Sequence, residues 1–185
     1  MSFIVNTKRL IMKVEGESIA PRALEFYIEN REYFDPYEPT RPSTFYTLEY
    51  QQAAAEYEYK ETVKGHSLRY YVYTKDAPDR IIGSINFFNI RPMPFSTASI
   101  GYKFHHEVWG KGYALEGCQA AIAVMFSNYN THRIEARVSP SNIRSIHLLE
   151  RLGFSYEGLE YKSVSINGVF TDHQRYSLIN SDHHL

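Results

Sequence analysis

The stretch Ile100-Gly-Tyr-Lys-Phe-His-His-Glu-Val-Trp-Gly-Lys-Gly-Tyr-Ala114 indicates a strand, a turn with two glycines and the start of a helix. Gly110 and Gly112 allow the backbone to turn tightly and to approach a ligand closely. The first turn of the following helix directs N–H groups and the positive end of its dipole outward. These features favour an anion, so the stretch predicts a phosphate cradle. It contains neither Gly-x-Gly-x-x-Gly nor Gly-x-x-x-x-Gly-Lys-Ser/Thr, which argues against the common nucleotide motifs.

The segments around the cradle predict a β-α-β unit. Residues 97–105 form the first strand, and residues 133–139 alternate apolar and charged side chains as a second strand does. The helix between them supplies the crossover that a parallel pair requires. Cys118 lies on the apolar stripe of this helix, so we expect a buried packing residue rather than a nucleophile.

Periodicity places further elements on both sides of this unit. Residues 9–14, 68–73 and 80–90 read as strands, and residues 18–33, 50–65 and 142–153 as helices. Asn167-Gly168 predicts a type I′ turn that joins strands 155–166 and 169–179. The chain therefore predicts one α/β (α+β) domain over residues 1–180, with a tail at 181–185. Its single mixed central sheet has about six to seven strands, flanked by about four helices.

Composition excludes several classes of protein. The chain has 185 residues, 43% of them hydrophobic, which is enough to bury a sizeable core. The formal net charge of −1, without a run of basic residues, indicates neither a nucleic-acid nor a membrane partner. A single cysteine excludes an intrachain disulfide and argues against a cysteine-rich zinc site. No signal peptide or membrane span is apparent, so we expect a cytoplasmic protein.

The histidines do not form a metal-binding pattern. The chain has no His-x-x-x-His pair, and we expect the adjacent His105 and His106 to point in opposite directions on a strand. We therefore expect no metal.

A proline-rich segment separates the first two predicted helices. Three prolines between Phe34 and Pro42 disfavour regular structure and stiffen the segment. A rigid aromatic loop can line a pocket, but it can equally be a plain connector.

Two linked motifs resemble the GNAT acetyltransferase superfamily. These are Trp109-Gly-Lys-Gly-Tyr-Ala-Leu-Glu116 and Asn142-Ile-Arg-Ser-Ile-His-Leu-Leu-Glu-Arg-Leu-Gly-Phe154. Thr7-Lys-Arg-Leu10, the loop from Asn30 to Pro39 and the segment from Asn167 to His173 are similar to its branch of ribosomal-protein alanine N-acetyltransferases. The resemblance spans nearly the whole chain. The same pattern also occurs in acetyltransferases of small amines, so it does not identify the acceptor.

The resemblance implies an acetyl-CoA site and an acceptor site. Backbone groups near Tyr102, Lys103 and Phe104 would hold the pantetheine arm, and Asn142 would contact it. The pyrophosphate would lie against Val108, Trp109, Gly110, Lys111, Gly112, Tyr113 and Ala114. The acceptor would meet Tyr33, Phe34, Tyr37, Glu38 and Asp172. Glu107 departs from the superfamily pattern, which has Gln or Arg there, and its carboxylate must point away from the phosphates.

Acetyl transfer to an amine requires a neutral nucleophile, a donor to the developing oxyanion and a proton for the leaving thiolate. Ser145 matches the serine that the family uses as the acid toward the CoA sulfur, and it lies three residues after Asn142, on the same helix face. The alternative is a helix-surface serine that bonds only the local backbone. A backbone N–H near Tyr102 or Lys103 would meet the oxyanion.

The sequence does not identify the general base unambiguously. Val164 occupies the position where some relatives carry a glutamate. Glu135 is the first candidate in its place, with an ion pair to Arg133 or Arg137 as the alternative; Glu157 and Asp172 are further carboxylates. A weak base suits an α-amine, because a group of pKa about 8 is roughly a tenth neutral at pH 7, whereas a lysine amine is neutral at only about four parts in ten thousand.

Three functions follow from the sequence. The first is an acetyl-CoA-dependent N-acetyltransferase acting on a protein N-terminal α-amine, with a ribosomal protein as the acceptor. The second transfers acetyl groups to a small amine, such as an amino acid, a polyamine or an antibiotic. The third is an acyl-CoA-binding sensor without turnover, which the Val164 and Glu107 departures motivate. A homodimer remains open.

Overall fold

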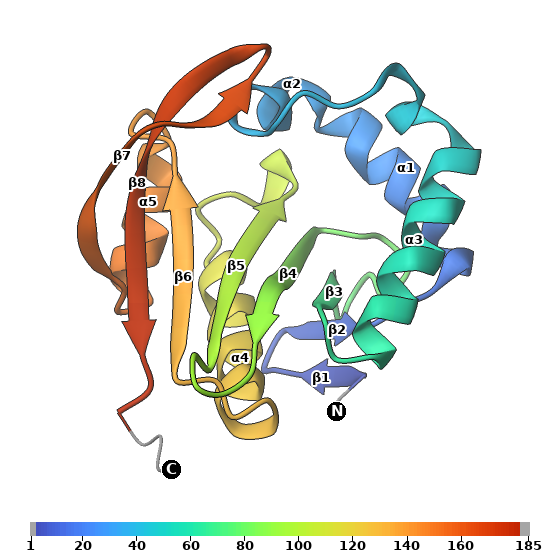
Figure 1. Cartoon of the computed structure of the whole chain (residues 1–185). Helices are drawn as coiled ribbons and strands as arrows, with labels where there is room; N and C mark the ends of the chain where they lie inside the picture. Colours follow the sequence, from blue (N-terminus) through green and yellow to red (C-terminus); the bar gives the residue numbers. More distant parts are fainter. Residues whose placement is uncertain (1–2, 182–185) are drawn as a thin grey trace.

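The computed structural model describes residues 3–181, which form one eight-stranded mixed sheet with helices on both faces (Figure 1). The strand order is β1-β2-β3-β4-β5-β6-β8-β7. The strands are β1 (Ile4–Asn6), β2 (Leu10–Lys13), β3 (Leu68–Thr74), β4 (Gly83–Arg91), β5 (Thr97–Phe104), β6 (Arg133–Val138), β7 (Ser155–Ile166) and β8 (Val169–Ile179). The predicted mixed sheet is confirmed, and the three-residue β1 raises the strand number above the expected six to seven.

Between residues 3 and 181, five α-helices accompany the sheet: α1 (Ala20–Glu29), α2 (Arg31–Phe34), α3 (Leu48–Val63), α4 (Tyr113–Asn128) and α5 (Ile143–Arg151). The expected helix over 18–33 is broken at the buried Asn30, which separates α1 from α2. The Asn30 side chain explains the break, since its Nδ2 donates to the Phe26 carbonyl at 2.9 Å and its Oδ1 accepts from the His106 N–H at 2.9 Å.

The proline-rich segment contains more regular structure than expected. Short 3₁₀ turns form at Asp35–Tyr37 and Ser43–Tyr46. Pro36 fits the first of these because its ring fixes φ near the helical value, and the turn needs no N–H from it. The expectation of an irregular loop is therefore wrong at Asp35–Tyr37, whereas residues 38–42 have no regular structure and the second turn begins after Pro42.

Two hydrophobic clusters hold the helices to the sheet. The larger one includes Ile85, Met125, Ile134 and Leu149 and lies beneath α4 and α5. The smaller one includes Phe26, Tyr71 and Tyr73 and packs α1 and α3 against the other face. Cys118 is fully buried in the larger cluster, and burial raises the pKa of its thiol, as expected for a packing residue. No helix within residues 3–181 is long and apolar enough to cross a bilayer.

The sheet opens at its only parallel junction among the described strands. β5 pairs with β6 through three residue pairs, Thr97–Arg133, Ala98–Ile134 and Ser99–Glu135, whereas β5 stays paired with β4 as far as Phe104. Beyond Ser99 the strands β5 and β6 separate (Figure 1). Gly101, Phe104, Ala136 and Val138, which follow this point on the two strands, line a cavity.

The predicted hairpin at the end of the sheet is confirmed, with both strands beginning and ending at the predicted residues. Asn167 (φ 50°) and Gly168 (φ 77°) both have positive φ, as a type I′ turn requires. Register shifts between Tyr156 and Gly158 and between Glu160 and Val164 interrupt the pairing of β7 with β8. Such irregularities increase the local twist of a hairpin.

Candidate active site

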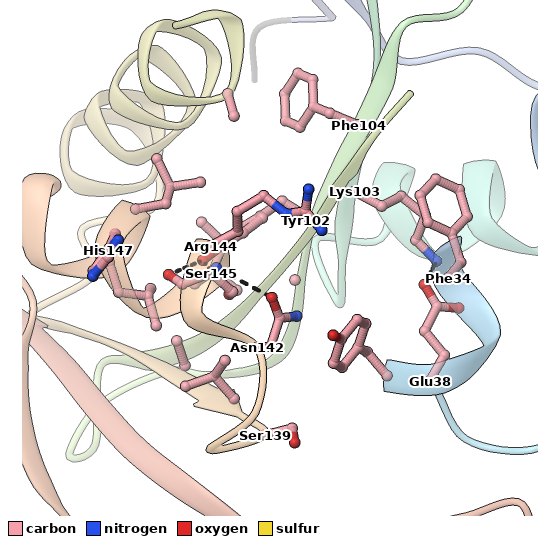
Figure 2. Close-up of a pocket in the computed structure, with 18 of the residues that line it drawn as sticks. Phe34, Glu38, Tyr102, Lys103, Phe104, Ser139, Asn142, Arg144, Ser145 and His147 are labelled. Carbon is pink, nitrogen blue, oxygen red and sulfur yellow. Dashed lines mark hydrogen bonds and ion pairs between the residues drawn. The ribbon is translucent and has the colours of Figure 1, made fainter. Parts of the chain in front are cut away.

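A cavity of about 580 Å³ lies where β5 and β6 separate. Its walls come from α2 and the following loop, from β3, β4, β5, β6 and β8, from the start of α4 and from the length of α5. Figure 2 shows β5 crossing the cavity, with Asn142, Arg144 and Ser145 on one side and Phe34, Lys103 and Glu38 on the other. The cavity can therefore receive two ligands from opposite faces of the sheet.

The predicted cradle forms one end of this cavity. Gly110 and Gly112 have φ values of 75° and 79°, and Gly112 is the N-cap of α4. Both glycines line the cavity together with Val108, Trp109 and Ala114. A Cβ atom on Gly112 would lie 3.3 Å from Arg9 Nη2, a close contact that the long arginine side chain can relieve, so it is the positive φ that favours glycine at this position. The start of α4 directs N–H groups into the space where the sequence predicts phosphates.

Arg9 and Glu116 support the cradle from behind. Glu116 accepts hydrogen bonds from Thr7 Oγ1 at 2.7 Å and from Arg9 Nε at 2.6 Å, and Arg9 Nη1 donates to the Lys111 carbonyl at 2.9 Å. Partial burial raises the pKa of Glu116, but these hydrogen bonds outweigh it and lower that pKa overall. Lys111 and Tyr113, which the resemblance placed at the pyrophosphate, do not line the cavity; the Arg9 guanidinium stacks over Tyr113 instead.

Basic residues of α5 add a feature that the sequence analysis missed. Arg144, His147 and Arg151 line the cavity, and the Arg144 guanidinium lies 3.5 Å above the Trp109 ring. Trp109 is itself fixed by its Nε1, which donates to the Phe104 carbonyl at 2.9 Å. Basic residue types at the i, i+3 and i+7 positions of a helix that carries an Asn-x-x-Ser motif are the signal that could have found them.

Asn142 and Ser145 lie together at the start of α5, as predicted. The Asn142 Oδ1 accepts from the Ser145 N–H at 3.2 Å and so caps the helix, which leaves the amide Nδ2 group on the cavity wall. Ser145 Oγ lies 2.8 Å from the phenol oxygen of Tyr102 on β5. Burial raises the pKa of Tyr102, which keeps the phenol protonated and able to donate to Ser145.

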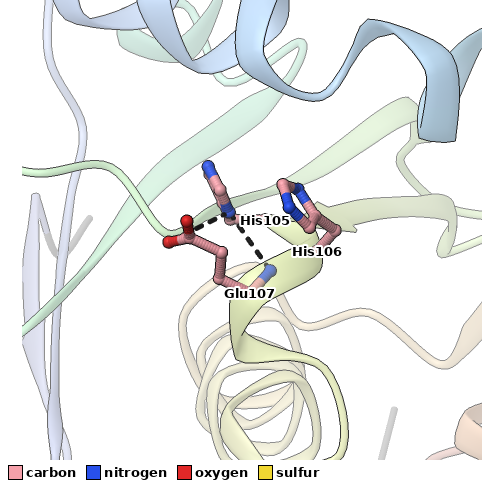
Figure 3. A group of neighbouring side chains, drawn as sticks. All are labelled: His105, His106 and Glu107. Carbon is pink, nitrogen blue, oxygen red and sulfur yellow. Dashed lines mark hydrogen bonds and ion pairs between the residues drawn. The ribbon is translucent and has the colours of Figure 1, made fainter.

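His105, His106 and Glu107 precede the cradle (Figure 3). The two histidine rings do not point in opposite directions as expected. They stack with centroids 4.7 Å apart, because β5 ends at Phe104 and His105 begins a 3₁₀ turn. Three of the four ring nitrogens are engaged by protein groups: His105 Nε2 lies 2.9 Å from Glu29, His105 Nδ1 accepts from the Glu107 N–H, and His106 Nδ1 lies 3.0 Å from Asn30. The group joins the end of α1 to the cradle.

Glu107 points away from the phosphate position, as its charge requires. Its carboxylate forms an ion pair with Arg80 at 3.0 Å, and Glu107 is not among the residues that line the cavity. The departure from the superfamily pattern therefore places no carboxylate in the cradle.

The loop after α2 lines the other side of the cavity. Tyr33, Phe34, Tyr37 and Glu38 all face it, which favours the pocket over the plain connector. The Glu38 carboxylate contacts two cations, Lys103 Nζ and the Arg41 guanidinium. The side chain of Lys103 is a second feature that the sequence analysis missed, because only its backbone was expected to act.

The three carboxylates considered as the general base, Glu135, Glu157 and Asp172, do not line the cavity. Glu135 accepts from Arg133 Nε at 2.9 Å, which is the ion pair given as the alternative to a base, and it borders a separate recess with Thr97 and Ser99. Asp172 accepts from the Lys162 N–H at 2.8 Å within the β7–β8 hairpin. Glu157 binds Arg133, Ser177 and Arg175, and the Arg133 hydrogen bond is the largest of the causes that lower its pKa to about 2. The structure therefore does not bring Glu135 or Asp172 together with Ser145.

Comparisons with known proteins agree with this geometry. The sequence pattern of the acetyltransferase (GNAT) domain matches residues 19–155. The chain is 36% identical to the probable N-acetyltransferase YjcK of Bacillus subtilis, over 91% of this chain and 98% of that protein. It is 32% identical to the [ribosomal protein uS5]-alanine N-acetyltransferase of Escherichia coli, over 96% and 91% of the two chains. The crystal structure of the ribosomal-protein-S5-alanine acetyltransferase from Vibrio fischeri superposes with a TM-score of 0.93, at 29% identity and full coverage of both chains.

The chain belongs to the GNAT acetyltransferase family. It is an N-acetyltransferase whose acyl donor is acetyl-CoA. The donor fits the features described above: a turn whose two glycines have positive φ, a helix N-terminus and basic side chains for phosphates, and a cavity that reaches Ser145.

The cradle yields a test that separates backbone geometry from overall stability. Gly112→Ala should weaken acetyl-CoA binding about tenfold, because left-handed backbone costs a non-glycine residue about 1–2 kcal/mol and its Cβ would crowd Arg9. Isothermal titration calorimetry measures the effect. Gly65→Ala is the matched control, since Gly65 has the same φ of 79° but open space around it, at the end of α3. Equal affinity of the Gly112→Ala variant and the wild type would show that the turn does not hold the phosphates.

Proposed function

We propose that this enzyme acetylates the N-terminal α-amine of a protein, with a ribosomal protein as the acceptor. The observation that carries the proposal is the full-length similarity to enzymes named for an alanine of ribosomal protein S5, in sequence and in structure. Such an enzyme acts in the cytoplasm, where ribosomal proteins are made.

The acceptor side of the cavity supports an amine substrate. Tyr33, Phe34 and Tyr37 offer aromatic faces, which attract cationic amines, and Glu38 offers a carboxylate. This side lies between the loop after α2 and β8, whose His173 also lines the cavity. An extended peptide N-terminus suits an opening between a loop and a hairpin, because only its first residues need to enter.

The donor side suggests roles for the predicted residues. In this proposal the backbone of Tyr102 to Phe104 and the Asn142 amide hold the pantetheine arm, while Val108 to Ala114 hold the pyrophosphate. The Ser145 hydroxyl donates its proton to the leaving sulfur. Tyr102, 2.8 Å away, orients that hydroxyl.

An acceptor panel at pH 7 tests the proposed function. CoA release should be faster with an N-terminal alanine peptide than with an α-blocked lysine peptide or spermidine, by about 100-fold in kcat/KM, because an α-amine is far more often neutral at this pH. A small amine that outperforms every peptide would assign the enzyme to metabolite acetylation. Tight acetyl-CoA binding without release from any amine would indicate the sensor.

Replacement of Ser145 tests its role as the acid. Ser145→Ala should lower kcat about 100-fold while acetyl-CoA affinity stays close to that of the wild type, because the hydroxyl acts on the leaving group. Stopped assays of CoA release and calorimetric titration give the two quantities. Ser155→Ala, at an exposed position that begins β7, is the control. An unchanged kcat would remove Ser145 from the mechanism.

A further inference from the structure

We propose that the side-chain amine of Lys103 is the general base that takes the proton from the acceptor ammonium. The proposal rests on the proposed function in that it assumes an amine acceptor on the Glu38 side of the cavity. Lys103 would then supply the base that Val164 cannot provide and that Glu135, in its ion pair with Arg133, does not provide.

The register of β5 brings Lys103 opposite the proposed acid. Neighbouring residues on a strand point to opposite faces, so Tyr102 reaches Ser145 on the α5 face while Lys103 reaches the face of α1 and α2. Lys103, Tyr102 and Ser145 all line the one cavity, with β5 between the two sides (Figure 2). A thioester that lies along β5 next to Ser145 can thus be attacked from the Lys103 side.

The charged groups around Lys103 are balanced when the Lys103 amine is neutral. An acceptor ammonium that enters brings one further positive charge. The groups that face Lys103 are Tyr27 of α1, Glu38 and Arg41 of the loop after α2, Glu58 of α3 and Arg69 of β3. Glu58 pairs with Arg69 at 3.0 Å, and Glu38 contacts both Arg41 and Lys103. With Lys103 neutral, two carboxylates balance the two arginines, which do not give up their protons. An entering ammonium is then a third cation, and the proton that can move within the group is the one it passes to Lys103.

Burial acts in the same direction. The Lys103 side chain is 16% exposed, and burial lowers its pKa to about 7, with Arg41 and Arg69 adding to the effect and Tyr27 and Glu58 opposing it. The contact with Glu38 favours the protonated form, so the carboxylate stabilises Lys103 after it has taken the proton. A base with a pKa near the working pH transfers protons efficiently.

The step balances as follows. The acceptor R–NH₃⁺ gives one proton to neutral Lys103 Nζ, and the free amine forms a C–N bond with the thioester carbonyl carbon. The C–S bond breaks with its electron pair on sulfur, which takes the Ser145 proton. The second amine proton leaves to water, Ser145 regains a proton from water, and Lys103 releases its own to solvent. The net products are the acetamide, CoA thiol and one proton.

Lys103→Arg separates the base from an ion-pair partner. Arginine keeps the positive charge next to Glu38 but does not act as a base. With an amine that the wild type accepts, kcat/KM should fall about 100-fold at pH 7, and the deficit should shrink to a few-fold near pH 9.5, where an α-amine of pKa about 8 is already neutral. Lys60→Arg, on the exposed face of α3, is the matched control.

A second acceptor substrate shows whether a loss of activity comes from the missing base or from a poor fit of the arginine side chain at position 103. A peptide with an aminooxy terminus carries a nitrogen that is neutral at pH 7, so both Lys103→Arg and the uncharged Lys103→Met should lose far less activity with it than with the α-amine peptide. A loss of equal size for both acceptors and at every pH would show that Lys103 only holds Glu38, and no loss would exclude any role. The wild-type acceptor preference tests the proposed function separately, because the Lys103 proposal depends only on the ratio of variant to wild type.

Discussion

The separation of β5 from β6 is the constraint on which the rest of the site depends. Three parallel residue pairs hold the two strands together, and beyond Ser99 they diverge while β5 remains paired with β4. A sheet that opens in this way exposes backbone N–H and C=O groups that need partners, which an extended donor can supply. The opening also connects the two faces of the sheet. The donor and the acceptor can therefore approach the same strand from opposite sides.

Side chains on both faces are fixed by contacts that span the chain. Thr7 and Arg9, before the second strand, hold Glu116 at the start of α4 and so support the cradle. On the other face, Asn30 breaks the first long helix and binds His106 just before the cradle. The break directs α2 and the proline-rich loop over the cavity. Contacts between residues far apart in the sequence thus support both sides of the cavity.

Local patterns predicted the elements well because each has a local physical cause. The Asn167-Gly168 turn, the apolar stripe of α4 and the N-cap at Asn142 are all decided by nearby residues. The break at Asn30 could not be predicted, since it depends on a partner 76 residues away. The prediction that His105 and His106 point in opposite directions was wrong for a similar reason, because the pairing of β5 with β4 sets where β5 ends.

The same distinction applies to the site. The cradle and Ser145 follow from short motifs, whereas the acceptor pocket depends on charges that only the fold assembles. Glu135 looked available in the sequence, but it is paired with Arg133. Lys103 looked like a backbone contact, but burial and its neighbours Arg41 and Arg69 change the chemistry of its amine. Electrostatic environment is the property that a single sequence conveys least.

The most direct test of two-sided access is a crystal structure with a bisubstrate analogue, in which an acetyl linker joins the CoA sulfur to the terminal nitrogen of an alanine peptide. The account predicts the pyrophosphate at Gly110 to Ala114, the sulfur beside Ser145 Oγ, and the peptide nitrogen on the Lys103 and Glu38 side of β5. A peptide nitrogen on the Ser145 face, or a peptide that leaves the cavity away from the loop after α2, would contradict it.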